Sequence, residues 1–478
     1  MQRRCKIVAT LGPSTDDLET LRNMVEAGLD VARLNFSHGN RQEQKKRLLN
    51  LRKIAGDCGR FVGVIGDLQG PKIRVRRFKK SSVRLKKGNS FFLDSTLGEA
   101  EGSSKGVSVA HDKMHLDVTV GDRLLLNDGQ IKLEVESLEG TRVNTTILIG
   151  GVISDHKGIN REGGGLSADA LTDKDKADIK FAAEVGMDFI AISFVRNAGD
   201  VHEARKLMEN AGGSGKIIAK IERAEALECI DEIIDASDAV MVARGDLGVE
   251  MGYAELTGKQ KQIIKKTTFN NKIVITATQM MESMIENPVP TRAEVSDVAN
   301  AVMDGTDAVM LSAETAVGKY PVSVIEAMSE VCIGAEKHIQ TRPRTTHRAD
   351  DRFSAIDEAI AMAVMHTANH LKVKAIIALT ETGTTTLWMS RARSDIPIYA
   401  FTPHDETSRR VTLYRGVYPV SFTIQESDRR ALYRDIFSTL LQHKLVEEGD
   451  RVIFTKGDLD GVSGGTNSMQ IVEVNTSA

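Results

Sequence analysis

Short apolar runs alternate with amphipathic stretches along most of the chain. Eight runs are rich in Val, Ile and Ala, which is typical of parallel strands buried on both faces. They span residues 6–11, 30–36, 61–67, 189–194, 216–222, 239–246, 272–279 and 308–314. Helix-like segments, such as 18–28 and 41–55, lie between most of them. Eight strand–helix units in one cyclic order favour a closed (β/α)8 barrel of the TIM type, with an open doubly wound sheet as the alternative.

The alternation of strands and helices is interrupted over residues 70–167, where the pattern becomes short and alternates polar with apolar positions. Two runs within 123–135 flank an Asn-Asp-Gly turn and predict a β-hairpin, and 141–149 predicts another strand. We therefore expect an all-β lid domain, 70–167, inserted into a barrel formed by 1–69 and 168–340.

A third unit follows a polar linker at 341–347. A helix with one apolar stripe begins near Ile356, and strand candidates then alternate with helices. The strand candidates are 375–379, 398–401, 417–422, 451–455 and 470–474. The pattern predicts a C-terminal α/β domain over 350–478.

Composition narrows the class of protein. The 478 residues fit about three domains. Lys and Arg total 63 against 66 Asp and Glu, and aromatic residues make up 4%, so nucleic-acid binding is not indicated. Four scattered cysteines without a CxxC pair argue against a disulfide framework or zinc site and favour a cytoplasmic protein. Because no apolar stretch approaches the length of a membrane helix, we expect no membrane partner.

Polar or charged residues stand at nearly every predicted carboxyl end of the barrel strands, where barrel enzymes gather their active groups. Two ends carry the carboxylates Glu222 and Asp246, and Lys220 precedes the first of them. Paired carboxylates beside a lysine suit a hard divalent cation next to phosphate, although two strand-end acids in ordinary ion pairs are the alternative. The other polar ends include Thr10, Arg33, Asn35, Asp67, Ser193, Thr278 and Ser312.

These residue types fit phosphoryl transfer. Charge spreads over the oxygens of a moving phosphoryl group, so a metal ion and a lysine stabilise that state. An arginine suits a substrate that bears phosphate and carboxylate, and a threonine hydroxyl can help to pass a proton. No Ser-His-Asp order or Cys-His pair is present, so acyl transfer has little support.

Several long motifs resemble those of the pyruvate kinase family, and the likeness spans essentially the whole chain. The motifs are RLNFSHG at 33–39, KIE at 220–222, MVARGDLG at 241–248, TATQMMESM at 276–284 and DGTDAVMLS at 304–312. The resemblance implies that phosphoenolpyruvate gives its phosphoryl group to ADP, yielding pyruvate and ATP in the final step of glycolysis. It also implies a homotetramer.

The resemblance assigns roles to the strand-end residues. It implies that Glu222 and Asp246 hold Mg2+ or Mn2+ together with substrate oxygens. It implies that Lys220 stabilises the transferring phosphoryl group and that Arg33 grips phosphate. A plain strand-end ion pair remains the alternative for Arg33.

Substrate recognition and protonation fall, by the same resemblance, to neighbouring positions. Asp246 and the backbone around Gly245 would meet the substrate, Gly245 at its carboxylate. Thr278 would lie on the face where enolpyruvate takes its proton, acting alone or through water. The alternative is that the Thr278 hydroxyl only satisfies a backbone carbonyl.

Four residues would approach the nucleotide phosphates by the same resemblance: Asn35, His38, Arg74 and Lys157. Lys157 belongs to the inserted domain, which suits a lid that closes over substrate and excludes water. A helix cap for His38 and a solvated loop position for Lys157 are the alternatives.

The chain departs from the family pattern at Lys72. Many relatives carry an acidic residue there and a threonine at the position of Leu68. In those forms Asn35, Ser37, Asp67 and the residue at 68 coordinate potassium. A lysine ammonium at 72 supplies a positive charge internally, so we predict activity without added K+, which puts the metal assignment of those residues in doubt.

A loop in the C-terminal domain predicts a phosphate site, because hydroxyls, backbone N–H groups and a helix N-terminus coincide there. In relatives the corresponding loop binds a phosphorylated effector. Many carry an arginine where this chain has Thr384, so a sugar monophosphate or AMP is favoured over fructose bisphosphate. A threonine-rich helix N-cap is the alternative. The candidate contacts are Thr380, Thr382, Gly383, Thr384 and Thr385.

Two other function classes compete with the phosphotransferase. A dikinase or carbon–carbon lyase would share the metal carboxylates but lack the lid and the ADP-facing residues, and a dikinase would need a phosphohistidine domain. A non-catalytic metabolite sensor would be expected to lose Lys220 or a metal carboxylate, and all of them are present.

Overall fold

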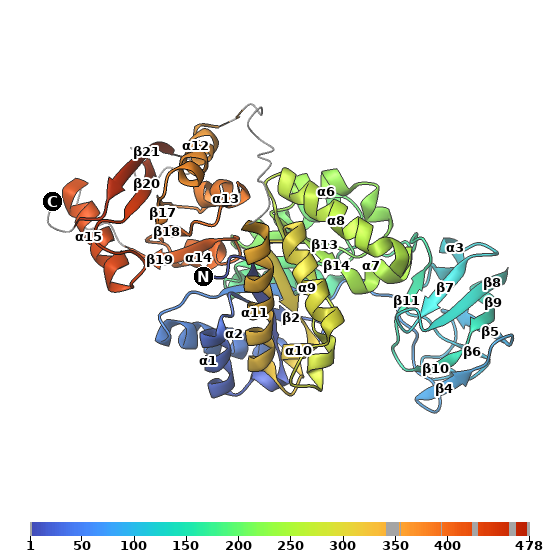
Figure 1. The fold of residues 1–478 in the computed structure, drawn as a ribbon. Coiled ribbons are helices and arrows are strands. Elements are labelled where there is room, and N and C mark those ends of the chain that lie inside the picture. The colour runs from blue at the N-terminus through green and yellow to red at the C-terminus, as the bar shows by residue number, and fades with distance from the viewer. Residues whose placement is uncertain are drawn as a thin grey trace.

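The computed structural model describes residues 2–340, 353, 355–392, 394–422, 429–457 and 465–475. Its central feature is a closed barrel of parallel strands in the order β1-β16-β15-β14-β13-β12-β3-β2, which confirms the barrel and rules out the open sheet (Figure 1). The strands are β1 (Lys6–Leu11), β2 (Val31–Asn35), β3 (Gly63–Asp67), β12 (Phe189–Ile192), β13 (Lys216–Ile221), β14 (Ala239–Ala243), β15 (Ile273–Ala277) and β16 (Ala308–Leu311).

Helices surround the barrel and begin and end at signals in the sequence. Asp17 accepts a hydrogen bond from Thr20 N at the start of the first helix, and Gly28 ends it with a left-handed φ of 115°. A capping box of Thr291 and Glu294 starts the ninth. The helices are α1 (Leu18–Ala27), α2 (Arg41–Asp57), α4 (Asp173–Glu184), α5 (Ala198–Asn210), α6 (Ile230–Ala236), α7 (Arg244–Met251), α8 (Tyr253–Phe269), α9 (Arg292–Asp304), α10 (Ala313–Ala316) and α11 (Pro321–Gln340).

Several barrel strands end before the predicted bounds, because the backbone turns sharply at the rim. Phe194, Thr278 and Gln279 adopt left-handed φ values of 58°, 68° and 52°. A β-branched residue such as threonine rarely adopts this conformation. Asp246 lies in the first turn of α7 instead of at a strand end. The rim is therefore a place where the backbone leaves the sheet to aim polar groups.

Between β3 and α4 the chain forms a β-rich insertion with its own apolar core. One sheet has the order β11-β7-β8-β9-β5-β6, and β10 pairs with β4. The predicted hairpin is β7–β8, and its turn has positive φ at Asn127, Asp128 and Gly129. The elements are β4 (Ser82–Leu85), β5 (Ser90–Asp94), β6 (Gly106–Val107), α3 (Met114–Asp117), β7 (Arg123–Leu126), β8 (Ile131–Glu139), β9 (Arg142–Ile149), β10 (Gly151–Ser154) and β11 (Ile159–Arg161).

The C-terminal unit is a five-stranded sheet in the order β19-β18-β17-β20-β21, parallel except for β21. The predicted linker at 341–347 lies outside the described residues. The strands are β17 (Ala375–Leu379), β18 (Ile398–Thr402), β19 (Val417–Ser421), β20 (Arg451–Gly457) and β21 (Thr466–Glu473). The helices are α12 (Ile356–His370), α13 (Thr384–Arg391), α14 (Asp405–Val411) and α15 (Arg429–Gln442).

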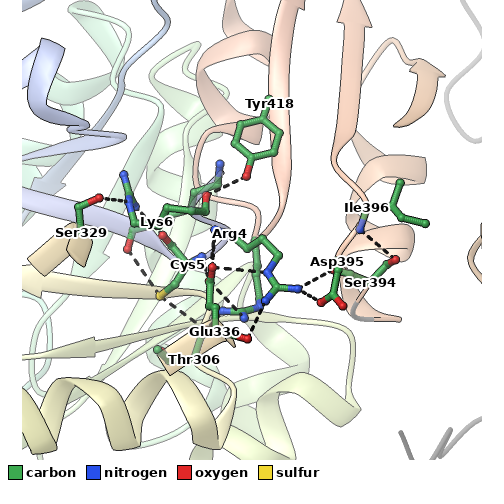
Figure 2. Close-up of polar contacts among 12 residues, drawn as sticks. Arg4, Cys5, Lys6, Thr306, Ser329, Glu336, Ser394, Asp395, Ile396 and Tyr418 are labelled. Carbon is green, nitrogen blue, oxygen red and sulfur yellow. Dashed lines mark hydrogen bonds and ion pairs between the residues drawn. The ribbon is translucent and has the colours of Figure 1, made fainter. Parts of the chain in front are cut away.

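The C-terminal domain packs against the amino-terminal end of the barrel, where Figure 2 shows a dense polar seam. Arg4 pairs with Glu336 of α11 and with Asp395. Lys6 donates to the carbonyl of Val417 at 2.6 Å, and its ammonium lies 4.3 Å from the ring centroid of Tyr418. The insertion lies on the other side of the barrel (Figure 1), so the C-terminal domain leaves the carboxyl ends of the strands free.

Candidate active site

Lys220 is the centre of a buried charged cluster at the carboxyl ends of β3, β12 and β13. Its ammonium nitrogen lies 3.1 Å from Asp67 Oδ1 and 3.0 Å from Glu222 Oε1. It also donates to Ser193 Oγ at 2.7 Å. Only 9% of the lysine is exposed. Three oxygen atoms from three strand ends therefore fix one ammonium group at the rim.

Arg33 joins the same cluster from the end of β2. Its Nε donates to Asp67 Oδ2 at 2.6 Å, and Nη1 donates to Thr10 Oγ1 at 2.9 Å. Arg33 is thus in a strand-end ion pair, as the alternative interpretation of this residue expected. Because Asp67 contacts both Arg33 and Lys220, it also holds the guanidinium and the ammonium group close together.

The electrostatics of the cluster follow from its burial. Burial lowers the pKa of Lys220, but the Asp67 and Glu222 carboxylates outweigh it, so the pKa is raised and the ammonium stays charged. Burial alone would raise the pKa of Asp67, but Lys220 and Arg33 hold it below its usual range. For Glu222, burial together with Asp246 and Asp67 outweighs Lys220 and raises the pKa.

Glu222 and Asp246 approach one another from different elements. Glu222, just after β13, accepts a hydrogen bond from Phe194 N at 2.7 Å. Asp246 accepts one from Lys72 Nζ, also at 2.7 Å. Among the described residues, no group of three or more His, Cys, Asp or Glu side chains is arranged to hold a metal ion. The two carboxylates therefore fit a hard cation only if substrate or water oxygens complete its shell, and a cation would relieve the mutual repulsion that raises the Glu222 pKa.

Thr278 and Gly245 are joined directly. The Thr278 hydroxyl accepts from Gly245 N at 2.9 Å and donates to the carbonyl of Ala277 at 2.6 Å. The second bond is the backbone contact that the alternative interpretation expected. Arg244 pairs with Asp297 and donates to the carbonyl of Thr278. Arg244 therefore supports the strained turn at Thr278.

The residues expected at the nucleotide phosphates lie on two parts of the chain. Asn35 Oδ1 accepts from Ser37 N at 3.0 Å, and His38 is exposed at the start of the β2–α2 connection. Arg74 donates to the carbonyl of His156 inside the insertion, beside the partly exposed Lys157. The bonds of Asn35 and Arg74 thus stay within the barrel rim and within the insertion, respectively.

The threonine-rich loop begins α13 with a tight turn. Gly383 has a φ of 86°, and its N–H donates to Thr380 Oγ1 at 2.9 Å. The Thr382 and Thr384 hydroxyls contact one another at 2.8 Å. The Thr385 hydroxyl is buried against Thr466 at 2.7 Å. All four threonines among the five candidate positions thus use their hydroxyls in contacts within the domain, Thr382 and Thr384 with one another.

Sequence reasoning missed three partners at the rim. The sequence places Thr10 and Ser193 at polar strand ends but does not indicate that they bond to Arg33 and Lys220. It indicates a positive charge at Lys72 but not the partner of that charge, Asp246. The strand-end position was the available signal for Thr10 and Ser193. Nothing near Lys72 indicated the pairing.

A buried lysine, an arginine and two carboxylates lie at the carboxyl rim of a (β/α)8 barrel, and these charges fit a barrel phosphotransferase. The family model for the pyruvate kinase barrel domain matches residues 2–325, and the model for the pyruvate kinase alpha/beta domain matches residues 358–472. The chain belongs to the pyruvate kinase family.

Curated relatives are similar over the full length. The chain is 51% identical over 476 residues to pyruvate kinase II of Salmonella typhimurium, covering 99% of both chains. It is 50% identical over 459 residues to a pyruvate kinase of Haemophilus influenzae, covering 95% of this chain and 96% of the relative. A pyruvate kinase of Geobacillus stearothermophilus is 42% identical over 478 residues, covering 98% of this chain and 80% of the relative.

The family fixes the reaction. The enzyme transfers the phosphoryl group of phosphoenolpyruvate to ADP, giving pyruvate and ATP, as a glycolytic kinase of a family that uses Mg2+. The dikinase, lyase and sensor alternatives are thereby set aside. No helix in the described part of the chain is long and apolar enough to cross a bilayer.

Proposed function

We propose that Lys220 and Arg33 bind and stabilise the phosphoryl group during its transfer from phosphoenolpyruvate to ADP. One observation carries the proposal: the Lys220 ammonium is buried, charged and fixed by three oxygen atoms. A preorganised charge in a site that excludes water stabilises developing negative charge without reorganisation. Arg33 shares Asp67 with Lys220, so its guanidinium is held beside the same phosphate.

Glu222 and Asp246 are the protein ligands of a divalent cation, Mg2+ or Mn2+, whose shell substrate oxygens complete. When bound, the cation neutralises charge on the phosphoryl and enolpyruvate oxygens. The proposal is supported by the raised pKa of Glu222, which burial and the neighbouring carboxylates cause. The divalent cation would share Glu222 with the Lys220 ammonium and displace the Lys72 ammonium from Asp246.

Gly245 and Thr278 handle the organic part of the substrate. The first turn of α7 presents the backbone of Gly245 to the carboxylate of phosphoenolpyruvate, and Asp246 follows in the same turn. The Thr278 hydroxyl is held by Gly245 N and the Ala277 carbonyl, on the face where the enolate is protonated. Threonine is a weak acid, so Thr278 orients the proton source, alone or through water.

The nucleotide is bound between barrel and insertion. Asn35 and His38 approach its phosphates from the rim, and Arg74 and Lys157 approach from the insertion, which acts as a lid. The domain boundaries that follow are 1–69 and 168–340 for the barrel, 70–167 for the lid and 350–478 for the C-terminal domain. They are supported by the separate apolar core of the insertion.

The enzyme does not require potassium, because Lys72 supplies a fixed positive charge close to Asp246. Asn35, Ser37 and Asp67 then serve as polar scaffold instead of potassium ligands. Asp67 supports this assignment, since it already pairs with both Arg33 and Lys220.

Regulation is proposed to run through the C-terminal domain. A phosphorylated effector, a sugar monophosphate or AMP, binds at Thr380, Thr382, Gly383, Thr384 and Thr385, supported by the turn at Gly383 and the start of α13. The enzyme is an allosteric homotetramer of the cytoplasm, and its four free cysteines fit a reducing compartment.

A coupled assay of pyruvate formation with ADP and Mg2+ tests the central assignment. Lys220→Ala is expected to lower kcat about a hundredfold to a thousandfold. Lys216→Ala is the matched control, because Lys216 lies at the other end of the same strand and is partly exposed. Wild-type turnover in Lys220→Ala would overturn the proposal.

A further inference from the structure

Glu250 is a buried carboxylate near the end of α7 that the chemistry described so far does not use. It is 6% exposed. Its Oε2 accepts from Ala224 N at 2.9 Å, and its Oε1 accepts from Asn160 Nδ2 at 3.2 Å. These donors belong to different parts of the molecule, because Ala224 follows β13 in the barrel and Asn160 lies in β11 of the insertion.

Each of the three joined segments carries residues of the proposed active site. Ala224 is two residues after Glu222, and α7 carries Gly245 and Asp246 in its first turn. Asn160 is three residues after Lys157 in the insertion. One side chain therefore connects both proposed metal ligands to the segment that carries a proposed nucleotide contact.

The backbone reinforces this junction. Gly163 N donates to the carbonyl of Glu250 at 2.8 Å, so the chain leaving the insertion is bonded to α7. Gly164 follows with a φ of 81°, and a Cβ there would lie 3.3 Å from Glu250 Oε2. Arg223, directly after Glu222, donates to the carbonyl of Leu166 at 3.1 Å. The exit of the insertion is thus fastened to the turn behind Glu222 at several points.

We propose that Glu250 is a positioning residue for phosphoryl transfer, whose carboxylate couples the placement of the insertion to the geometry of Glu222 and Asp246. The proposal rests on the roles proposed above for these two residues. The bond to Asn160 holds the insertion over the nucleotide, and the bond to Ala224 holds the turn that aims Glu222. Loss of the bond to Asn160 weakens binding of ADP, whereas loss of both bonds also weakens binding of the divalent cation.

Three variants of the full-length enzyme separate the two bonds. Asn160→Ala removes only the bond to the insertion. Glu250→Ala removes both bonds. Glu250→Gln keeps both, because its amide oxygen accepts from Ala224 N–H while its amide nitrogen donates to the oxygen of a rotated Asn160 amide.

Asn160→Ala is expected to raise the KM for ADP about tenfold and to leave the half-saturating Mg2+ concentration unchanged. Glu250→Ala is expected to raise both the KM for ADP and the half-saturating Mg2+ concentration. The double variant Asn160→Ala/Glu250→Ala is expected to have the same KM for ADP as Glu250→Ala, because that substitution already removes the bond to Asn160. Glu250→Gln is expected to stay close to wild type. Arg161→Gln is the matched control, since Arg161 pairs with Asp122 inside the insertion.

The outcome decides the proposal even if Glu250→Ala fails to fold, because Asn160→Ala keeps the bond to Ala224. An unchanged KM for ADP in Asn160→Ala would overturn the proposal. So would a double variant, Asn160→Ala/Glu250→Ala, in which the increases of the two single variants in the KM for ADP multiply. Lys220→Ala in the same assay separates the two proposals. An active Lys220→Ala enzyme contradicts the catalytic assignment, whereas an inactive one beside a normal Asn160→Ala enzyme contradicts only the role of Glu250.

Discussion

The ammonium group of Lys72 lies 2.7 Å from a carboxylate oxygen of Asp246. Lys72 comes from the first residues of the insertion and Asp246 from α7, 174 residues further along the chain. Burial lowers the pKa of Lys72, but Asp246 and Asp128 outweigh it and raise the pKa, so the lysine is charged. A fixed cation thus contacts a proposed ligand of the divalent cation.

Lys72→Met is expected to strengthen binding of Mn2+ to the substrate-free enzyme about fivefold, because a partly exposed ammonium no longer competes for Asp246. The same variant is expected to lose activity in potassium-free buffer, because the internal charge is gone. Titration followed by the electron paramagnetic resonance of free Mn2+ measures the first effect. Lys79→Met, exposed in the insertion, is the control. Equal Mn2+ affinities in wild type and Lys72→Met would contradict the competition.

The wild-type enzyme is expected to turn over at similar rates with and without potassium. The physical reason is the charge of Lys72, which already balances the carboxylates at the rim. Initial rates in a buffer free of both sodium and potassium, compared with a potassium buffer of equal ionic strength, provide the measurement. A large stimulation by potassium speaks against this prediction.

The paired substitution Thr382→Ala/Thr384→Ala is expected to weaken activation by a sugar monophosphate or AMP. These two hydroxyls contact one another at the start of α13, whereas the Thr385 hydroxyl is buried against Thr466. Activation curves at sub-saturating phosphoenolpyruvate report the loss. The half-saturating Mg2+ concentration, which depends on the distant barrel rim, serves as the internal control. Activation of normal strength would place the effector elsewhere.

The barrel and its central lysine could be predicted because their signals are local. Buried parallel strands appear as continuous apolar runs, and Lys220 and Glu222 stand at the end of one of them. The position of Asp246 was predicted, but its element was not, since helix α7 begins directly at Arg244. The strand-end pattern alone does not show where a strand gives way to a helix.

Contacts across the insertion could not be predicted from the sequence. The pairing of Lys72 with Asp246 and that of Asn160 with Glu250 depend on how the insertion docks on the barrel. Glu250 in particular looks like an ordinary helical acid in the sequence. Only its burial and its two donors from separate parts of the chain distinguish it.

Glu250 also predicts a pH dependence of stability. Burial raises its pKa to about 7, although Ala224 N–H, Asn160 and Arg223 lower it, and Glu225 adds to the rise. Between the ordinary glutamate pKa and about 7, the folded protein holds a proton that the unfolded chain has released. Raising the pH through this window therefore lowers the free energy of unfolding.

Glu250→Gln removes this titration and is expected to gain stability relative to wild type as the pH rises from about 5 to about 8, by at most about 3 kcal/mol. Melting temperatures of both proteins across this range measure the difference. Glu255→Gln, an exposed carboxylate at the start of α8, is the matched control and is expected to track wild type. Parallel curves of melting temperature against pH for Glu250→Gln and wild type would contradict this prediction. They would mean that Glu250 is already ionised at about pH 5 and that burial does not raise its pKa.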